Sequence, residues 1–462
     1  MESLALLVVA LFLLGMTVLG AWHARRVRTA EDFALAGRRL GAPVLAGTLI
    51  ATWVGTGSIF GFAQKAFEHG VTAFVLPLSG LTGMLLLAWI APRVREIPAS
   101  SVPEILGLRF GGGARRLGAV ALLGAYLIIV SYQYRAGAAV AHRMFPDLPE
   151  TGLYVGFAAF VILYTALAGL VSVALTDVVN GAVMLTGILA ALVWMYWTWD
   201  PGRQPVPEAL AAPDFPPTRL VNWLLPGFLL VLGDANLQQR FLAARTPATA
   251  RRAAFLAFGG LLILESSIVL LAFLSRVRLP AEILERPGYN PAHVIVDAAF
   301  HLVPAGIGVF IAAAVVAVIV STADSFLLAC STTAATDLGG GMTTPFRQRL
   351  LVLLLGLLAL GMAFLSSRFF EVALVAYTIY GATLTPAVAC ALLWPDTPPR
   401  AVLAGMAAGL GTVVVWEWLW PWLLPGVAKP GLLGELDSVL PALCMNLAVL
   451  LLVQAASRRR PA

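Results

Sequence analysis

A short polar run interrupts an apolar segment of membrane-spanning length at residues 321–325. Ser321 and Thr322 supply two adjacent hydroxyls, and Asp324 supplies a carboxylate. A carboxylate at bilayer depth is costly and usually faces a partner or a water-filled path. A bare Na⁺ ion needs hard oxygen ligands, which neighbouring hydroxyls provide without adding a net charge. The run favours a small-cation site inside a membrane, although helical hydroxyls also bond back to the preceding turn.

The whole chain has the composition of an integral membrane protein. Its 462 residues are 60% hydrophobic and only 12% charged, and the mean hydropathy is +0.89. A soluble chain carries roughly twice that charged fraction. The sequence contains no basic run interleaved with aromatic residues, so the pI of about 9.5 does not indicate nucleic-acid binding.

Apolar runs of about 20 residues recur along the chain, separated by short polar loops, and they predict an all-α polytopic membrane protein. Hydropathy and loop punctuation together suggest about thirteen transmembrane helices. The predicted spans lie near residues 3–22, 43–63, 72–92, 117–141, 151–169, 171–197, 220–237, 253–275, 304–335, 349–366, 369–393, 401–422 and 437–456.

The distribution of Lys and Arg tests this span count, because successive loops alternate between the two faces of the membrane. Twenty of the 30 Lys and Arg residues, Arg240 among them, fall on one face. Nine fall on the other face, and Arg135 lies inside a span. The positive-inside rule makes the richer face cytoplasmic. We therefore expect a cell (inner or plasma) membrane protein with its N-terminus outside and its C-terminus in the cytoplasm.

Two of the predicted spans are interrupted by glycine or proline. One interruption covers residues 51–57, and the other covers residues 226–234. If the core begins at the second span, these are the first helices of two successive five-helix halves. Broken helices at matching positions indicate a binding site near the bilayer midplane in inverted-repeat transporters. The alternative is close helix packing through small residues, which also enriches glycine in membranes.

Four stretches in chain order are similar to those of the sodium:solute symporter family. Residues 31–38 read Glu-Asp-Phe-Ala-Leu-Ala-Gly-Arg, and residues 51–57 read Ala-Thr-Trp-Val-Gly-Thr-Gly. Residues 168–179 contain Ala-Gly-Leu-Val-Ser-Val-Ala-Leu-Thr-Asp-Val-Val, and residues 321–325 read Ser-Thr-Ala-Asp-Ser. Within the family, the second and fourth stretches look most like those of the high-affinity choline transporter branch.

The resemblance implies a Leu-transporter-like core of five plus five helices related by an inverted repeat. On that basis an N-terminal helix and cytoplasmic loop precede the core, and two C-terminal helices and a basic tail follow it. The four parts are residues 1–42, 43–199 (first repeat), 200–395 (second repeat) and 396–462.

The resemblance also implies a Na⁺ site between the first broken helix and the polar run. Its ligands would be the main-chain carbonyls of Ala51, Val54 and Val318, together with the hydroxyls of Ser321 and Thr322. A broken helix frees carbonyls that no amide four residues on can claim, and a cation can satisfy them.

Two further acids are candidates for the ion path or for a second ion site. The resemblance places Asp177 on the exit path of the ion, but Asp177 could also be a helix N-terminal acid with Thr176 near the cap. Asp324 could belong to a second cation site, could accept a proton, or could pair with a buried cation such as Arg135.

The residues that could bind solute are scattered over several helices. Trp53 lies at the first break, where family members place substrate-contacting side chains, and an indole face can bind a cation. Asp234 follows the second break and could face an amine, whereas Arg135 could bind a carboxylate. Tyr132 and Tyr377 are the aromatic candidates. This set suits a zwitterion or a carboxylate as well as a quaternary ammonium ion.

We therefore expect a Na⁺-coupled secondary active symporter that imports a small polar or charged organic solute by alternating access. Na⁺ is the coupling ion, and the expected partners are the solute and the lipid membrane, with no nucleic acid and no obligatory protein partner. The sequence shows no Walker loop, no histidine metal cluster and no Ser–His–Asp spacing, so an enzyme is not expected. Two alternatives stay open, namely H⁺ coupling through Asp324 and a transporter-like sensor domain.

Overall fold

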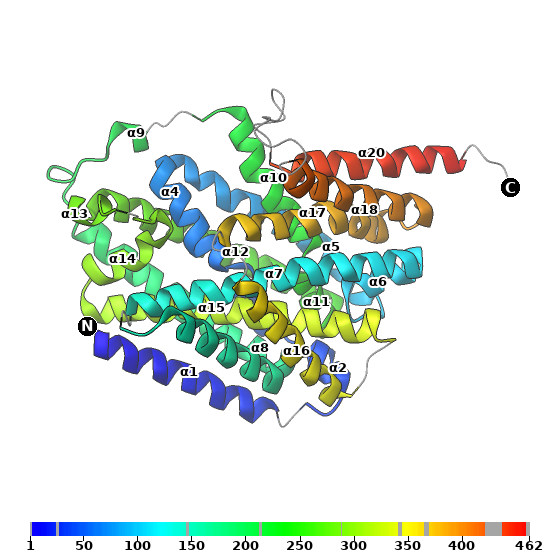
Figure 1. Ribbon diagram of the computed structural model, residues 1–462, viewed down its shortest axis with the longest axis horizontal. Coiled ribbons are helices and arrows are strands. Elements are labelled where there is room, and N and C mark those ends of the chain that lie inside the picture. The colour runs from blue at the N-terminus through cyan, green and yellow to red at the C-terminus, as the bar shows by residue number, and fades with distance from the viewer. Residues whose placement is uncertain are drawn as a thin grey trace.

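The protein folds into a bundle of helices, seen here in a computed structural model (Figure 1). The structure describes residues 2–24, 27–144, 147–211, 215–287, 289–340, 344–364, 369–420 and 437–458. The end of the predicted basic tail, residues 459–462, lies outside these ranges.

The helices of the N-terminal half are α1 (Glu2–Ala24), α2 (Ala30–Leu35), α3 (Ala42–Trp53), α4 (Ala63–His69), α5 (Val75–Glu96), α6 (Val102–Phe110), α7 (Gly112–Met144), α8 (Glu150–Trp197) and α9 (Glu208–Ala211). Those of the C-terminal half are α10 (Pro217–Gly233), α11 (Ala235–Leu242), α12 (Pro247–Arg278), α13 (Ala281–Leu284), α14 (Val294–His301), α15 (Ala305–Thr333), α16 (Pro345–Ala363), α17 (Phe369–Leu393), α18 (Pro399–Val414) and α20 (Val439–Arg458). Short turns join or extend these helices, and one of them, the π-helical turn η2 (Gly57–Phe62), matters for the site.

Eleven helical segments in the described ranges are long and apolar enough to cross a membrane. Two shorter apolar helices, Leu7–Trp22 and Ala42–Trp53, accompany them. The all-helical membrane class predicted from the sequence is confirmed, whereas the count of thirteen spans stays a prediction. The predicted division between residues 151–169 and 171–197 is present, because Gly169 interrupts α8 with a φ of 63°. Only glycine adopts that conformation readily.

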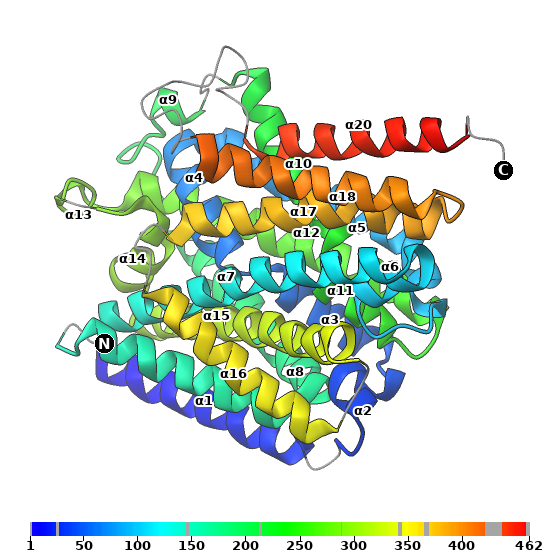
Figure 2. The same cartoon turned by 45° about the vertical axis from the view of Figure 1, so that its right-hand side comes forward.

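Helix α15 lies at the centre of the bundle. Its side chains are buried from Ile311 to Thr333, in keeping with a helix that is apolar on all sides. Figures 1 and 2 show α15 beside α7, α8 and α16, with α1 against α8 on one flank and the α18–α20 pair on the other. The polar run of residues 321–325 is therefore held in the protein interior, away from lipid.

Both helix breaks predicted from glycine and proline are confirmed. Helix α3 ends at Trp53, where Val54 leaves the helical region with a ψ of 99°. Helix α10 ends at Gly233, and Asp234 has a ψ of 113° before α11 begins. Glycine is needed at the second break, because a Cβ on Gly233 would lie 2.2 Å from Thr385 Oγ1.

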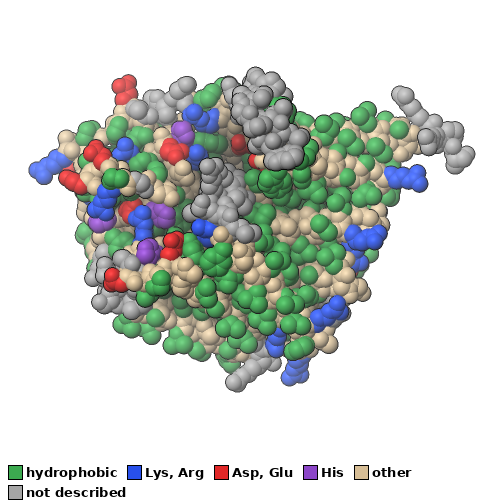
Figure 3. Space-filling view, viewed as in Figure 1, with side chains coloured by type: hydrophobic (Ala, Val, Ile, Leu, Met, Phe, Trp, Pro, Cys, Tyr) green, Lys and Arg blue, Asp and Glu red, His purple; other side chains and the backbone are tan. Residues whose placement is uncertain are grey.

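The two ends of the bundle differ in charge (Figure 3). The end that carries α6 and the C-terminal part of α20 shows basic side chains, whereas the opposite end mixes acidic, basic and histidine side chains. One arginine was misplaced by the sequence prediction. Arg240 is fully buried in α11 and does not belong to the basic surface with which it was counted.

Candidate functional site

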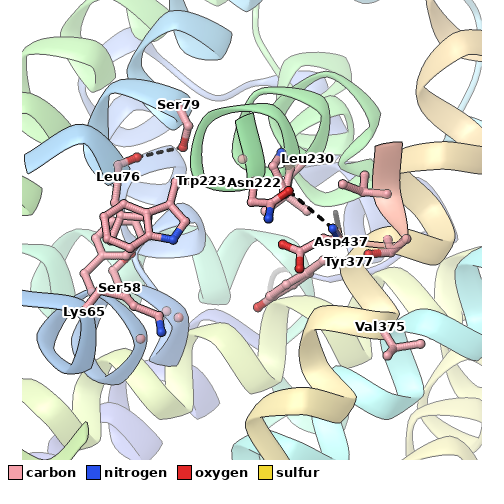
Figure 4. A pocket seen from close by; sticks show the side chains of 18 of the residues that line it. Ser58, Lys65, Leu76, Ser79, Asn222, Trp223, Leu230, Val375, Tyr377 and Asp437 are labelled. Carbon is pink, nitrogen blue, oxygen red and sulfur yellow. Dashed lines mark hydrogen bonds between the residues drawn. The ribbon is translucent and has the colours of Figure 1, made fainter. Parts of the chain in front are cut away.

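A cavity of about 1020 Å³ reaches from one end of the bundle to the two helix breaks. Figure 4 shows part of its lining, where the main-chain N–H of Asp437 donates to Asn222 Oδ1 at 3.3 Å. We call the residues near the breaks the inner part of the cavity: Trp53, Asp234, Thr322, Phe326, Tyr377 and Tyr380. The basic residues of the lining, Lys65, His69 and Arg219, come from α4 and from the first turn of α10.

The end of α3 meets the polar run of α15, as the predicted ion site requires. Ser321 Oγ lies 3.3 Å from the main-chain oxygen of Ala51. Thr322 is buried, and its hydroxyl has no hydrogen-bond partner among the described residues. Gly55 allows this approach, because a Cβ there would lie only 3.0 Å from Thr322 Oγ1. A buried hydroxyl without a hydrogen-bond partner, next to carbonyls freed by the helix break, is suited to be a Na⁺ ligand.

The other two proposed ligands adjoin this contact in the chain. Val54 is the residue that ends α3, and its amide donates the last helical hydrogen bond to Ile50 O. Val318 lies on α15 one turn before the two hydroxyls. The break itself is held from α7, because Gln133 Nε2 donates to Thr56 Oγ1 at 3.0 Å.

A buried ion pair lies directly behind the proposed ion site. Asp177 Oδ2 accepts hydrogen bonds from Arg240 Nη2 at 3.2 Å and from the Thr48 hydroxyl at 2.5 Å. Asp177 Oδ1 accepts from the Ser321 hydroxyl at 2.5 Å. Arg240 in turn donates to Thr48 and to Ser325 Oγ, the latter at 2.7 Å. Every one of these side chains is buried, so the network is shielded from solvent.

This network corrects three expectations about Asp177 and Asp324. Asp177 lies two turns inside the second segment of α8, so it is not a helix N-terminal acid. Thr176 bonds back to Ser172 and Val173 in place of capping a helix. Asp324 does not lie against Arg135: its Oδ1 accepts from Ser325, which also accepts from Arg240.

Three of the five predicted solute-binding residues line the cavity, namely Trp53, Asp234 and Tyr377. The other two do not. Tyr132 is buried on α7, outside the lining. Arg135 donates to the main-chain oxygen of Ala363 at 2.5 Å and lies over the ring of Tyr154. The sequence argument for a carboxylate-binding arginine therefore loses its geometric support.

The second break places Asp234 between a helix and an aromatic cluster. Its Oδ1 accepts from the amide of Leu237, which makes Asp234 the N-cap of α11. Its Oδ2 accepts from the Tyr380 hydroxyl at 3.3 Å. The Tyr126 hydroxyl accepts from the amide of Ala235 at 2.8 Å, so it caps the same helix start.

Glu265 is a buried acid behind the cavity wall, on α12. One carboxylate oxygen accepts from Trp53 Nε1 at 2.9 Å and from the Ser58 hydroxyl at 3.1 Å. The other oxygen has no hydrogen-bond partner among the described residues. The sequence offered no role for Glu265, and it also missed Arg240. Both residues could have been found from the sequence, because each is a charged residue within or beside an apolar span and therefore needs a buried partner.

The fold and the site together define a class of protein. Two broken helices meet near the middle of a membrane bundle, and their freed main-chain groups face a large cavity and a hydroxyl pair, which is the architecture of a secondary transporter. The sequence profile of the sodium:solute symporter family matches residues 33–409. The chain belongs to that family, and it is a Na⁺-coupled symporter of a small solute.

Curated relatives align over most of the chain. The high-affinity proline transporter PutP of Bacillus subtilis is 25% identical, with 96% of this chain and 97% of that protein covered. The human sodium/iodide cotransporter is 27% identical, with 87% of this chain and 68% of that protein covered. These relatives are transporters. They differ in the solute for which they are named, so they do not test the predicted choline transporter branch.

A solved structure shares the fold over nearly the full length. It is described as the substrate-bound outward-open state of a Na⁺-coupled sialic acid symporter, and it superposes with a TM-score of 0.80 at 15% identity. The match covers 98% of this chain and 97% of that one. The predicted fold class is thereby confirmed. At this level of identity the likeness concerns the fold alone.

Proposed function

We propose that this protein imports a small polar or charged organic solute together with Na⁺, by alternating access across a cell (inner or plasma) membrane. One observation carries the proposal beyond the family assignment. The end of α3 and the hydroxyl pair of α15 are in contact, through Ser321 Oγ and the main-chain oxygen of Ala51. Residues that are 270 positions apart in the chain thus supply neighbouring oxygen atoms in a buried site.

The proposed Na⁺ ligands are the carbonyls of Ala51, Val54 and Val318 and the hydroxyls of Ser321 and Thr322. Bound Na⁺ bridges Ser321 Oγ and the Ala51 carbonyl oxygen, which lie 3.3 Å apart. The Ser321 hydroxyl keeps its hydrogen bond to Asp177 Oδ1, which leaves its oxygen lone pairs for the ion. Asp177 therefore orients a ligand, and the five ligands themselves are neutral. Neutral ligands bind Na⁺ moderately, so that the ion can leave after transport.

The cavity is the proposed solute site. Its lining includes Thr322, so a solute in the inner part lies next to the ion site. Na⁺ that stabilises the open arrangement raises the affinity for solute, and linkage requires the solute to raise Na⁺ affinity equally. We place the two halves of the core at residues 43–199 and 200–395, between the flanking segments 1–42 and 396–462.

We also propose that the N-terminus lies outside and the C-terminus in the cytoplasm. The basic end of the bundle in Figure 3 supports this orientation, since basic residues concentrate on the cytoplasmic face. The cavity lining includes the first turn of α10 and residues 437–439, which lie away from that basic end. In this orientation the cavity faces the outside.

The ion site can be tested with Na⁺ itself as the probe. We expect NaCl to stabilise the purified protein against heat more than equimolar KCl does. The double variant Ser321→Ala with Thr322→Ala removes two of five ligands, so that Na⁺-specific stabilisation disappears. Ser331→Ala on the same helix is the matched control, because that hydroxyl only bonds back to Leu328. A double variant that still responds to Na⁺ like the control contradicts the assignment.

Two other functions give different outcomes in proteoliposomes. Coupling to H⁺ through Asp324 is favoured by one observation, since its Oδ2 has no hydrogen-bond partner among the described residues. In that case a pH gradient drives uptake in Na⁺-free buffer. A sensor domain on the same fold binds its ligand without concentrating it inside the vesicles.

A further inference from the structure

We propose that the solute carries a cationic nitrogen, which binds in the inner part of the cavity between Trp53 and Tyr377 and beside Asp234. Glu265 acts as a positioning residue that holds Trp53 in place for this contact. The inference rests on the proposed function, and it names the chemical class of the solute.

Aromatic side chains line the inner part from opposite helices. Trp53 comes from the end of α3, while Tyr377 and Tyr380 come from α17. The Tyr377 hydroxyl reaches the first break, since a Cβ on Gly57 would lie 3.9 Å from it. The rings of Tyr377 and Tyr380 meet edge to face, with centroids 6.2 Å apart. Aromatic faces bind cations through the ring quadrupole, and a tryptophan face does so best.

The charges of the lining favour a cation in the same place. Asp234 is the acid of the inner part, and its donors are an amide and the Tyr380 hydroxyl, neither of which carries a positive charge. The basic residues of the lining, Lys65, His69 and Arg219, lie outside this inner part, on α4 and the first turn of α10. There Lys65 pairs with Glu68 at 3.0 Å, and Arg219 lies 3.5 Å from His69.

A solute carboxylate is therefore not the anchoring group. The arginine proposed from the sequence to bind one, Arg135, lies outside the lining. Arg240, which is fully buried, is paired with Asp177 behind the ion site. An amino acid still fits, because its ammonium group supplies the cationic nitrogen.

Glu265 holds the Trp53 side chain in position. Its carboxylate accepts the indole N–H at 2.9 Å, and the same edge of the ring packs on α5, where a Cβ on Gly80 would lie 2.5 Å from Trp53 Cζ2 and 3.0 Å from Trp53 Nε1. The ring is thus fixed along its N–H edge, and the side chain lines the cavity.

Pairs of compounds with the same shape and different charge test the solute class. The first pair is choline and 3,3-dimethylbutan-1-ol, and the second is proline and cyclopentanecarboxylate. The full-length protein in NaCl is titrated with each compound, and binding is measured as thermal stabilisation. We expect the nitrogen compound of at least one pair to bind about tenfold more tightly than its partner. Equal or tighter binding by the partner overturns the proposal.

The ion response separates this inference from the proposed function. If NaCl stabilises the protein and neither choline nor proline does, the solute class is wrong and the Na⁺ site stands. If NaCl itself has no specific effect, the proposed function fails.

Variants then test the residues with the nitrogen compound that binds. Asp234→Asn lowers its affinity about tenfold and leaves the affinity of its partner unchanged. Glu265→Leu removes the acceptor of the indole and causes a similar loss, whereas Glu265→Gln keeps an acceptor and recovers part of the affinity. Glu282→Gln, an exposed acid on α13, is the control and changes nothing. Wild-type selectivity in both Asp234→Asn and Glu265→Leu overturns the assignment.

Discussion

Two groups of buried acidic residues lie near the break at the end of α3, and they differ in the cation that each can bind: the first centre is Asp177 with Arg240, and the second is Asp234 with Glu265. In the first centre Asp177 is paired with Arg240 at 3.2 Å and accepts two hydroxyl bonds. In the second centre Asp234 and Glu265 accept only from amide, indole and hydroxyl donors. Both centres are buried to a similar degree, so burial does not explain the difference.

The difference assigns a structural role to one centre and a binding role to the other. A buried carboxylate with a resident guanidinium has its charge neutralised within the protein, and it can serve to orient neighbouring groups such as Ser321. A buried carboxylate beside a cavity, without an ion-pair partner among the described residues, retains its attraction for a cation that enters the cavity. The helix break supplies the carbonyls for Na⁺.

The largest loss of stability is expected from breaking the ion pair between Asp177 and Arg240. Asp177→Asn leaves the Arg240 guanidinium buried without its ion-pair partner, which costs about 3–5 kcal/mol of stability. The loss is measured as a lowered melting temperature of the purified protein in detergent.

The double variant Asp177→Asn with Arg240→Met is the control for that experiment. Since it removes both charges, we expect it to recover most of the lost stability. A double variant as unstable as Asp177→Asn alone shows that the charge pair is not the source of the loss, and it removes the basis of the comparison.

A smaller effect, on Na⁺ affinity, is expected from a substitution at Gly55 in the helix break. A Cβ there lies 3.0 Å from Thr322 Oγ1, so Gly55→Ala pushes the hydroxyl away from the proposed ligand position. We expect Na⁺ affinity to fall about tenfold, which corresponds to roughly 1.4 kcal/mol. Titration of thermal stability with NaCl measures it. Gly411→Ala on α18, where a Cβ meets open space, is the control and leaves the Na⁺ affinity unchanged.

Local patterns predicted the parts of the site that depend on one segment. The glycines around Trp53 and before Asp234 predicted both breaks, because no regular helix accommodates these segments easily. The hydroxyl pair predicted a small-cation site, the family resemblance placed that site against the first break, and the two segments are in contact. Hydropathy predicted the helical class and placed the division near Gly169.

Long-range pairing was not predictable from a single sequence. Arg240 lies at the end of an apolar span, where a loop arginine of the cytoplasmic face is equally expected, and only the packing of α11 inward reveals its partner Asp177. Arg135 and Tyr132 have suitable side chains at a suitable depth, but the rotation of α7 turns them out of the cavity lining. The partner of Glu265 is more than two hundred residues away in the chain.

The smallest loss of stability is expected from the same Asp-to-Asn substitution at Asp234. Asp234→Asn keeps a side-chain oxygen for the amide of Leu237, and asparagine caps helices about as well as aspartate does. Buried Arg240 keeps its ion pair with Asp177 when Asp234 is replaced, so we expect a stability change of about 0.5 kcal/mol or less. The melting temperature should therefore stay close to that of the wild type, while the selectivity for a cationic nitrogen is lost. A loss of stability as large as that of Asp177→Asn means that Asp234 also forms a structural ion pair. In that case the distinction fails between a centre that holds an arginine of the protein and a centre that binds a cation from the cavity.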